Sequence, residues 1–154
     1  MPYPWNSGDV LTANDLNAGI GARAKKIGYA EKFGSPILSN VIAIQDIPGL
    51  SMTVTVDTSK IYLFVLEGFG INSTSGNVWS NIYVRDSGVS LAQKKTFVTT
   101  AYGNTMTLVA PHQFAAGGAH TIVASIDRNG GGGQLDIYGI SLPWTLSMYD
   151  MGDM

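Results

Sequence analysis

The chain has 154 residues, few charged side chains (13%), many glycines (19) and no cysteine. Its net charge of −2 gives no reason to expect nucleic-acid binding, which usually needs a basic patch. The lack of cysteine excludes disulfides and cysteine-ligated zinc. With many short apolar runs, this composition is typical of one all-β domain that buries roughly 70% of its unfolded surface.

No secretory or membrane-spanning signal is expected in this sequence. Residues 1–30 lack a basic segment followed by an apolar stretch of about 7–15 residues. No window approaches the ~20 apolar residues of a membrane span. We therefore expect a protein made in a cytoplasm, which a larger particle could later carry out.

The first ten residues predict an extended arm with two aromatic anchors. Pro2 and Pro4 fix their own φ angles and push the preceding residues toward extended conformations. Tyr3 and Trp5 are large apolar side chains on a segment with little internal structure. They either fold back on the protein's own core or dock on another protein, and the sequence does not favour one over the other.

A short helix is predicted to follow the arm. Thr12 is its N-cap, Asp15 approximates a capping box, and Leu11 with Leu16 fits a hydrophobic staple. An apolar stripe along the helix consists of Ala13, Leu16, Ile20 and Ile27. Its C-terminal end is basic, with Arg23, Lys25 and Lys26.

Two glycines weaken the interior of this helix. Gly19 and Gly21 each cost about 1 kcal/mol relative to alanine, so the helix needs something to pack against. We predict an anchoring arm and helix over residues 1–27 and a β-sandwich domain over residues 28–154.

From Ile27 onward the hydrophobic period changes to two residues, which predicts a series of short strands. Turn signals recur about every 8–12 residues, as is typical of a sandwich or a barrel. One turn is expected at Ile47–Leu50. The predicted strands before the last hairpin cover residues 29–33, 37–44, 51–57, 61–67, 78–86, 89–93, 96–100 and 105–110, and the final one covers 141–149.

Four consecutive glycines, Gly130–Gly133, lie between two runs rich in β-branched residues and predict a β-hairpin. With the loop centred on these glycines, Ile126 is opposite Ile137 and Asp127 is opposite Asp136. The period of two then predicts one buried face, with Ile122, Ala124, Ile126 and Ile137. The other face is expected in solvent, with Ser125, Asp127, Asp136 and Tyr138.

The facing aspartates of this hairpin are unfavourable because like charges oppose each other across the strands. A Ca²⁺ ion or a bridging Arg128 would relieve the repulsion, and so would a bulge or a register shift. We assign no metal ligand to either aspartate.

No catalytic, metal or cofactor site is predicted. His112 and His120 have no Cys or second His at ligand spacing, so packing roles are expected. The chain has no Gly-x-Ser-x-Gly elbow, and its glycine-rich stretches do not open a helix after a strand as phosphate loops do. Three aromatic residues could stack on sugars if exposed, although burial is the commoner outcome: Tyr102, Trp79 and Trp144.

The segment Pro4–Ala18 reads PWNSGDVLTANDLNA. It resembles the opening of many tailed-bacteriophage structural proteins, which begin with a short aromatic lead and a "GDVLTAxDLN"-like stretch. The C-terminal portion is similar to small phage virion domains in residues 117–123, in the Arg128–Gly133 loop and in the closing Leu146–Gly152. Its strand pattern is similar to the trimeric jelly roll of the tumour-necrosis-factor-like class. The resemblance covers residues 4–18 and 47–152.

This resemblance implies an all-β antiparallel sandwich (jelly roll) and a non-enzymatic structural protein located in a phage virion. A minor tail or short-fibre component is favoured over a capsid decoration protein, and a carbohydrate- or receptor-binding module is the second class. The absence of a long shaft segment argues against a long fibre. The implied anchoring and assembly residues are Tyr3, Trp5, Leu11, Thr12, Asp15, Leu16 and Ile20.

The implied partners are other virion proteins, of the tail or the capsid, contacted through the N-terminal arm. Two further copies in a homotrimer are expected, and a host-surface glycan is a candidate ligand. No nucleic acid, membrane or cofactor is expected as a partner.

Overall fold

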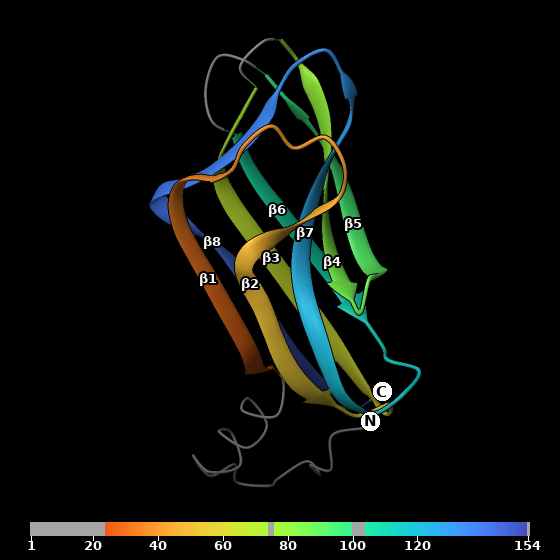
Figure 1. Cartoon of the computed structure of the whole chain (residues 1–154). Helices are drawn as coiled ribbons and strands as arrows, with labels where there is room; N and C mark the ends of the chain where they lie inside the picture. Colours follow the sequence, from red (N-terminus) through yellow and green to blue (C-terminus); the bar gives the residue numbers. More distant parts are fainter. Residues whose placement is uncertain (1–23, 74–75, 100–103, 154) are drawn as a thin grey trace, which may run out of the picture.

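The computed structural model describes residues 24–73, 76–99 and 104–153, which form two four-stranded antiparallel sheets packed face to face (Figure 1). Sheet A has the order β1-β8-β3-β6, and sheet B has the order β2-β7-β4-β5. This is the predicted all-β jelly-roll sandwich. The strands are β1 (Lys25–Leu38), β2 (Gln45–Val56), β3 (Lys60–Ser73), β4 (Val78–Asp86), β5 (Val89–Val98), β6 (Asn104–His112), β7 (Gly118–Gly131) and β8 (Leu135–Asp153).

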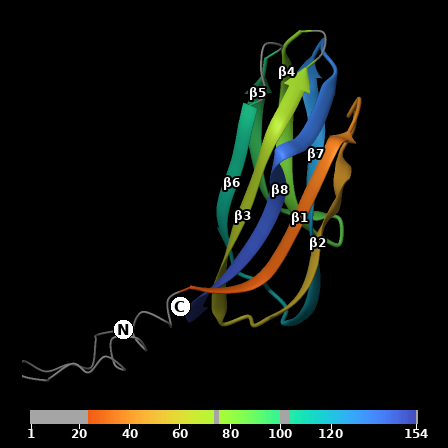
Figure 2. The same ribbon diagram turned by 90° about the vertical axis from the view of Figure 1, so that its left-hand side faces the viewer.

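Figure 2 shows the two sheets as separate layers. The core lies between them, where alternate side chains of each strand are buried. In β2, Met52, Val54 and Val56 are buried while Thr53 and Thr55 are exposed, as the period of two predicts. The central strands contribute a second set of buried residues, which includes Tyr62, Phe64, Leu66, Ile122, Ile126, Leu146 and Met148.

Trp144 of β8 is the largest fully buried side chain in the described residues. Its indole Nε1–H donates to the Tyr138 carbonyl at 3.0 Å, so its polar atom is satisfied. Gly68 of β3 makes room for the ring, since a Cβ there would overlap the indole. The closest approach of β3 and β8 therefore depends on a glycine.

The predicted turn between β4 and β5 is confirmed. Ser87 and Gly88 have φ angles of 48° and 88°, the left-handed values that a tight two-residue hairpin turn needs. Asp86 pairs with Val89 across the turn, and the register continues to Val78 opposite Val98. The pairing of the hairpin shifts register once, between Val84 and Arg85.

The predicted hairpin around Gly130–Gly133 is wrong. β7 pairs with β2 and β4, whereas β8 pairs with β1 and β3, so residues 132–134 cross from one sheet to the other. Each strand lies inside its own sheet and gains two neighbours, which a two-stranded hairpin cannot provide. The predicted inward faces of Ile122, Ala124, Ile126 and Ile137 are nevertheless confirmed.

The predicted pairing of Asp127 with Asp136 disappears with that hairpin. Asp127 lies opposite Asn81 of β4. Asp136 is buried and accepts a hydrogen bond from the Asn40 backbone N–H at 2.7 Å, which holds the loop between β1 and β2. No cation is needed between the two carboxylates.

Several predicted strand ends also need correction. The strands expected at 29–33 and 37–44 are one long β1, which continues to Leu38 through register shifts, followed by a loop. The turn expected at Ile47–Leu50 is a bulge inside β2, with Gly49 at a φ of 82°. The strands expected at 89–93 and 96–100 form a single β5. Pro111 lies within β6, where a proline is tolerated because β6 is an edge strand.

The predicted helix is wrong at its C-terminal end. Lys25, Lys26 and Ile27 belong to β1, where Lys25 pairs with Asp150 and Lys26 with Tyr149 of β8. The remainder of the predicted arm and helix lies outside the described residues, so the boundary at residue 27 stays a prediction. Within the described part of the chain, no helix has the length and apolar character needed to cross a membrane.

The first and last described strands meet at one end of the sandwich. Lys25 of β1 pairs with Asp150 of β8, and Lys60 of β3 pairs with Asp153. We call this the proximal end. β4 starts and β5 ends at the opposite, distal end, where Val78 pairs with Val98 and with Gly131 (Figure 1).

Candidate functional site

The outer face of sheet A, called face A below, has an apolar band across all four strands. One row joins Tyr29, Ser147, Val65 and Val109, and the next joins Lys26, Tyr149, Leu63 and Pro111. Tyr29 is 48% exposed and Val109 is 57% exposed. On this face Leu63 and Val65 of β3 are only half-buried, whereas Tyr62, Phe64 and Leu66 of the same strand are buried in the core.

The apolar band continues into a shallow cavity toward the distal end of face A. The cavity has a volume of 310 Å³ and is lined by Glu67, Gly68, Thr105, Leu142, Pro143 and Thr145. Leu142 is 60% exposed and the neighbouring Ile140 is 67% exposed. An exposed apolar surface of this extent on a folded domain typically marks an interaction site.

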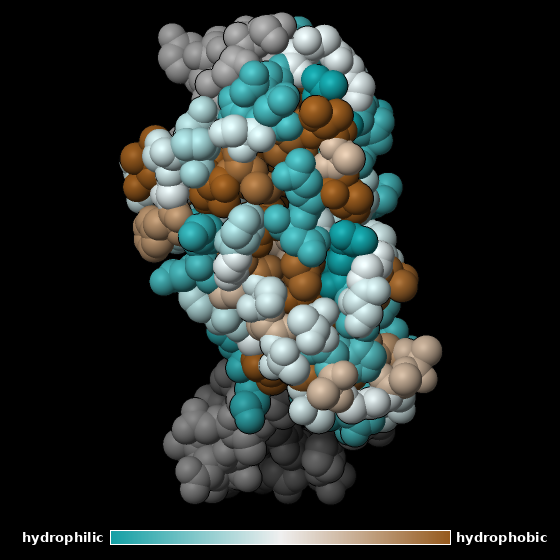
Figure 3. Space-filling model, in the orientation of Figure 1, coloured by the Kyte–Doolittle hydropathy of each residue, from teal (hydrophilic) through white to brown (hydrophobic). Residues whose placement is uncertain are grey.

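The outer face of sheet B, called face B below, is mostly polar. Figure 3 views the side of β2 and β7, where hydrophilic and intermediate residues separate smaller hydrophobic patches. Asp46 links the strands by accepting hydrogen bonds from the Ser125 hydroxyl at 2.6 Å and from Arg85 at 3.2 Å. Arg85 and Asp46 also border a cavity of 360 Å³. Face B therefore suits contact with water or with a polar ligand.

A second carboxylate on face B is held by β4. Asp127 accepts hydrogen bonds from the Asn81 backbone N–H at 3.2 Å, from the Asn81 side-chain amide at 2.9 Å and from the Tyr83 hydroxyl at 2.7 Å. Burial, together with the hydrogen bond to Asp127, raises the pKa of Tyr83 above its usual value. Tyr83 therefore stays a protonated donor at neutral pH, and the carboxylate is held in place.

Two aromatic side chains lie beside this network at the distal end. Trp79 of β4 pairs with Phe97 of β5, and their ring centroids are 4.8 Å apart. Trp79 is 43% exposed and Phe97 is 41% exposed. Of the three predicted sugar-stacking candidates, only Trp79 is shown at the surface, because Trp144 is fully buried and Tyr102 lies outside the described residues.

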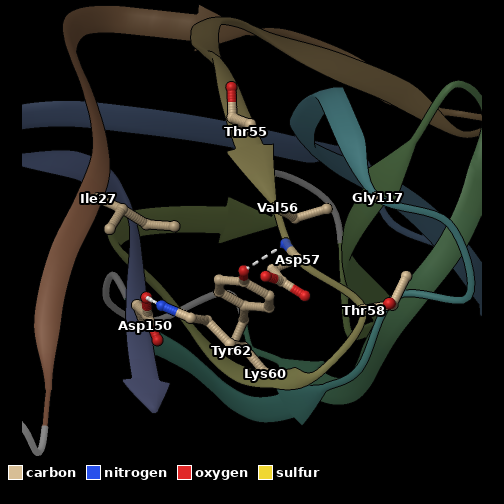
Figure 4. Close-up of a pocket in the computed structure, with 9 residues that line it drawn as sticks. All are labelled: Ile27, Thr55, Val56, Asp57, Thr58, Lys60, Tyr62, Gly117 and Asp150. Carbon is tan, nitrogen blue, oxygen red and sulfur yellow. Dashed lines mark hydrogen bonds and ion pairs between the residues drawn. The ribbon is translucent and has the colours of Figure 1, made fainter. Parts of the chain in front are cut away.

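A cavity of 390 Å³ lies at the proximal end, next to the start of β1 (Figure 4). Lys60 and Asp150 form an ion pair of 2.7 Å on its wall, and the Tyr62 hydroxyl accepts a hydrogen bond of 2.7 Å from the Asp57 backbone N–H. The Asp57 side chain in turn accepts two hydrogen bonds of 2.9 Å from Ser59.

Lys60 and Asp150 neutralise each other in this proximal cavity, and the third charge, on Asp57, is held by Ser59. The hydrogen bond to Asp150 raises the pKa of Lys60, and the hydrogen bonds from Ser59 lower the pKa of Asp57. Burial alone would raise the pKa of Asp150, but hydrogen bonds from Lys60 and Gly152 hold it below its usual value. These groups stabilise the ends of β2, β3 and β8.

His120 and His112 pack at the proximal end of the core rather than forming a metal site. His120 Nδ1 lies 2.6 Å from Asp86 Oδ2, and its Nε2 lies 3.1 Å from the Ala116 carbonyl. Phe114 lies between the two imidazoles, with centroid distances of 4.6 Å to His120 and 4.7 Å to His112. Across residues 24–73, 76–99 and 104–153, no three His, Asp or Glu side chains gather as a metal site requires.

The predicted anchoring residues cannot be placed on this framework. Tyr3, Trp5, Leu11, Thr12, Asp15, Leu16 and Ile20 all lie outside the described residues. The sequence analysis did not identify the pairing of Phe97 with Trp79 or the rows of face A. Alternate apolar positions in β3 and β6 were the available signal for face A, but only the strand order shows that these positions share one surface.

The sequence matches no protein-family model and no curated protein. Among solved structures, the Eiger TNF from S. frugiperda aligns with 84% of this chain and 96% of its own, with a TM-score of 0.50 and 12% identity. An arabinose-bound α-L-arabinofuranosidase aligns over 90% of this chain and 24% of its own, with a TM-score of 0.39 and 20% identity. A structure of infectious bursal disease virus aligns over 86% of this chain and 37% of its own, with a TM-score of 0.35 and 13% identity. The first similarity shows that the chain has a TNF-like jelly-roll fold.

Proposed function

We propose that this protein is a non-enzymatic structural component of a tailed-phage virion. It is made in the host cytoplasm, anchored to other virion proteins by residues 1–27, and displays a homotrimer of the β-sandwich. The observation that carries the proposal is the difference between the two outer faces. Face A is apolar across Tyr29, Val65 and Val109, while face B is polar and held by Asp46 and Asp127.

This division of faces favours self-association through face A. In a trimer, contact between copies would cover the apolar band, while face B would remain in water. The band consists of strand residues with little backbone freedom to lose on association, so covering it costs little ordering entropy.

The position of the chain ends supports the anchoring role. β1 begins at the proximal end, beside the end of β8, so the N-terminal arm joins the sandwich there. An anchor at one end leaves the distal end pointing away from the particle. The resemblance of residues 4–18 to the opening of phage structural proteins supports a virion as the site of anchoring.

We favour a minor tail or short-fibre component over a capsid decoration protein at the head surface. A tail component and a capsid decoration protein would use the same arm and the same displayed sandwich. The two roles differ only in the protein that the arm contacts.

The anchoring proposal predicts the effect of the double substitution Thr12→Ala with Leu16→Ala. Removing the N-cap and half of the hydrophobic staple should weaken the helix by about 1–2 kcal/mol. Incorporation into phage particles, measured by immunoblot of purified particles, should fall several-fold. The melting temperature of the isolated protein should stay within about 2 °C of wild type.

The surface substitution Thr53→Ala on face B serves as the control and should incorporate normally. Equal losses of incorporation and of thermal stability in the double variant would contradict an anchoring role for the helix.

A further inference from the structure

The aromatic pair Trp79 and Phe97 is not required by the core of the sandwich. The core side of β4 consists of Val78, Ser80, Ile82 and Val84, and all four are fully buried. Trp79 and Phe97 point to the other side and leave more than two fifths of their surfaces in water. Large aromatic side chains exposed beside a polar face are typical of ligand-binding surfaces.

Polar groups of fixed position surround this pair. Asn81, two residues along β4 from Trp79, is 2% exposed and donates its amide to Asp127 at 2.9 Å. Lys95 lies opposite Asn81 on β5, and its ammonium is 4.9 Å from the centre of the Trp79 ring. An acceptor carboxylate, an amide and a cationic donor therefore lie along the edge of an aromatic surface.

We propose that Trp79, Phe97, Lys95 and Asp127 form a saccharide-binding site, in which the buried Asn81 holds the Asp127 carboxylate in place. A pyranose ring has an apolar face of C–H groups, which stacks on an aromatic ring, and hydroxyls around its rim, which pair with carboxylate and ammonium groups. The two rings match the first part of such a ligand, and Asp127 and Lys95 match the second. A few fixed polar groups beside an apolar surface are the usual means by which a site orients a small ligand.

A nucleic acid fits the surface less well. It would meet the carboxylates Asp127 and Asp46 on a protein with a net charge of −2.

Lys95 does not block the stacking surface. A cation over an exposed aromatic ring is held only weakly, because water screens the attraction. Stacking of a ligand on the ring is of similar strength, and hydrogen bonds to the displaced ammonium add to it. Lys95 can thus leave the ring and donate to a sugar oxygen or carboxylate.

The site lies where a displayed domain would meet a surface. Trp79 and Phe97 are next to the Val78–Val98 pair at the distal end, away from the meeting of Lys25 with Asp150 (Figure 1). They are also on face B, which self-association through face A leaves open. This location links the site to the proposed function, but saccharide binding does not depend on that function.

The full-length protein should be applied to a printed array of neutral and acidic oligosaccharides. The strongest hit is then titrated in solution by isothermal titration calorimetry, which does not depend on Trp79 as the reporter. We expect binding by wild type, and Trp79→Ala and Phe97→Ala should each weaken it about tenfold or more. Both rings are more than half buried and pack on each other, so the variants should melt somewhat below wild type. Circular dichroism spectra like that of wild type would show that both variants fold.

Val89→Ala is the matched control, since Val89 is an exposed apolar residue at the other end of the same hairpin and is 65% exposed. It should bind as wild type does. The proposed saccharide site would be overturned if the protein bound no oligosaccharide, either on the array or in solution at millimolar sugar. It would also be overturned if Trp79→Ala bound the sugar as wild type does. Neither result bears on incorporation of the protein into particles. The saccharide site can therefore be refuted while the proposed virion function stands, and the reverse also holds.

Discussion

At the scale of single residues, His120 makes the stability of the protein depend on pH. Both ring nitrogens face acceptors, namely the Asp86 carboxylate and the Ala116 carbonyl. Only the protonated imidazolium can donate to both. The hydrogen bond with Asp86 accordingly raises the pKa of His120 above its ordinary value of 6.5.

We predict that His120 contributes stability that is fully present below about pH 6.5 and is lost as pH rises through the raised pKa of the folded state. His120→Gln should therefore lower the melting temperature more at pH 5.5 than at pH 9. Thermal unfolding followed by circular dichroism at the two pH values measures this difference.

His112 acts in the opposite direction, because burial lowers its pKa, so it removes stability as pH falls below about 6.5. His112→Gln provides the comparison, and it should flatten the acid side of the stability profile. An effect of His120→Gln that is the same at both pH values would show that the imidazolium of His120 is not important for folding.

At the scale of strands, face A makes a prediction about association. Val109 lies on the edge strand β6 and is 57% exposed, so Val109→Asp should cost the isolated domain little. In a trimer built through face A, the same substitution buries an unpaired charge. Light scattering should give about three times 16.3 kDa for wild type and about 16.3 kDa for the variant.

Thr53→Asp, an equally small change on the edge strand of sheet B, should leave the trimer intact. A wild-type protein that is monomeric at micromolar concentration would contradict the trimer. A Val109→Asp variant that remains trimeric would place the interface elsewhere.

The strands also show which parts of the fold the sequence could predict. β4 and the turn after it were predicted with correct ends, because alternation and the Ser87-Gly88 turn are local signals. The hairpin at Gly130–Gly133 was wrong, because its four glycines are equally compatible with a turn and with a crossing between sheets. The choice depends on partners more than 40 residues away along the chain, such as Asn81 for Asp127.

In the candidate sites, too, local patterns could be predicted from the sequence and long-range strand pairing could not. The exposure of Trp79 could be predicted from alternation along β4, since Val78 and Ser80 occupy the inward positions. The contact of Trp79 with Phe97 depends on the register of β5, and the sequence pattern predicts two strands there instead of one. The apolar rows of face A depend on the order of β1, β8, β3 and β6, and no local pattern contains that order.

At the scale of the whole molecule, the two ends and the two faces have different roles. The arm joins at the proximal end, beside Lys25 and Asp150, while Trp79 and Phe97 lie at the distal end. Face A is apolar and suits contact with further copies, and face B is polar and suits water or a ligand. A sandwich arranged in this way would suit the proposed display on a particle, with the proposed saccharide site directed outward.

The most direct test of this account is gold-labelled antibody imaging of purified phage particles from cells that produce the protein. The account predicts label on intact particles, at the tail tip for a minor tail or short-fibre component and over the head for a decoration protein. Absence of label from intact particles, with the protein detected in the same lysate, would contradict the virion assignment.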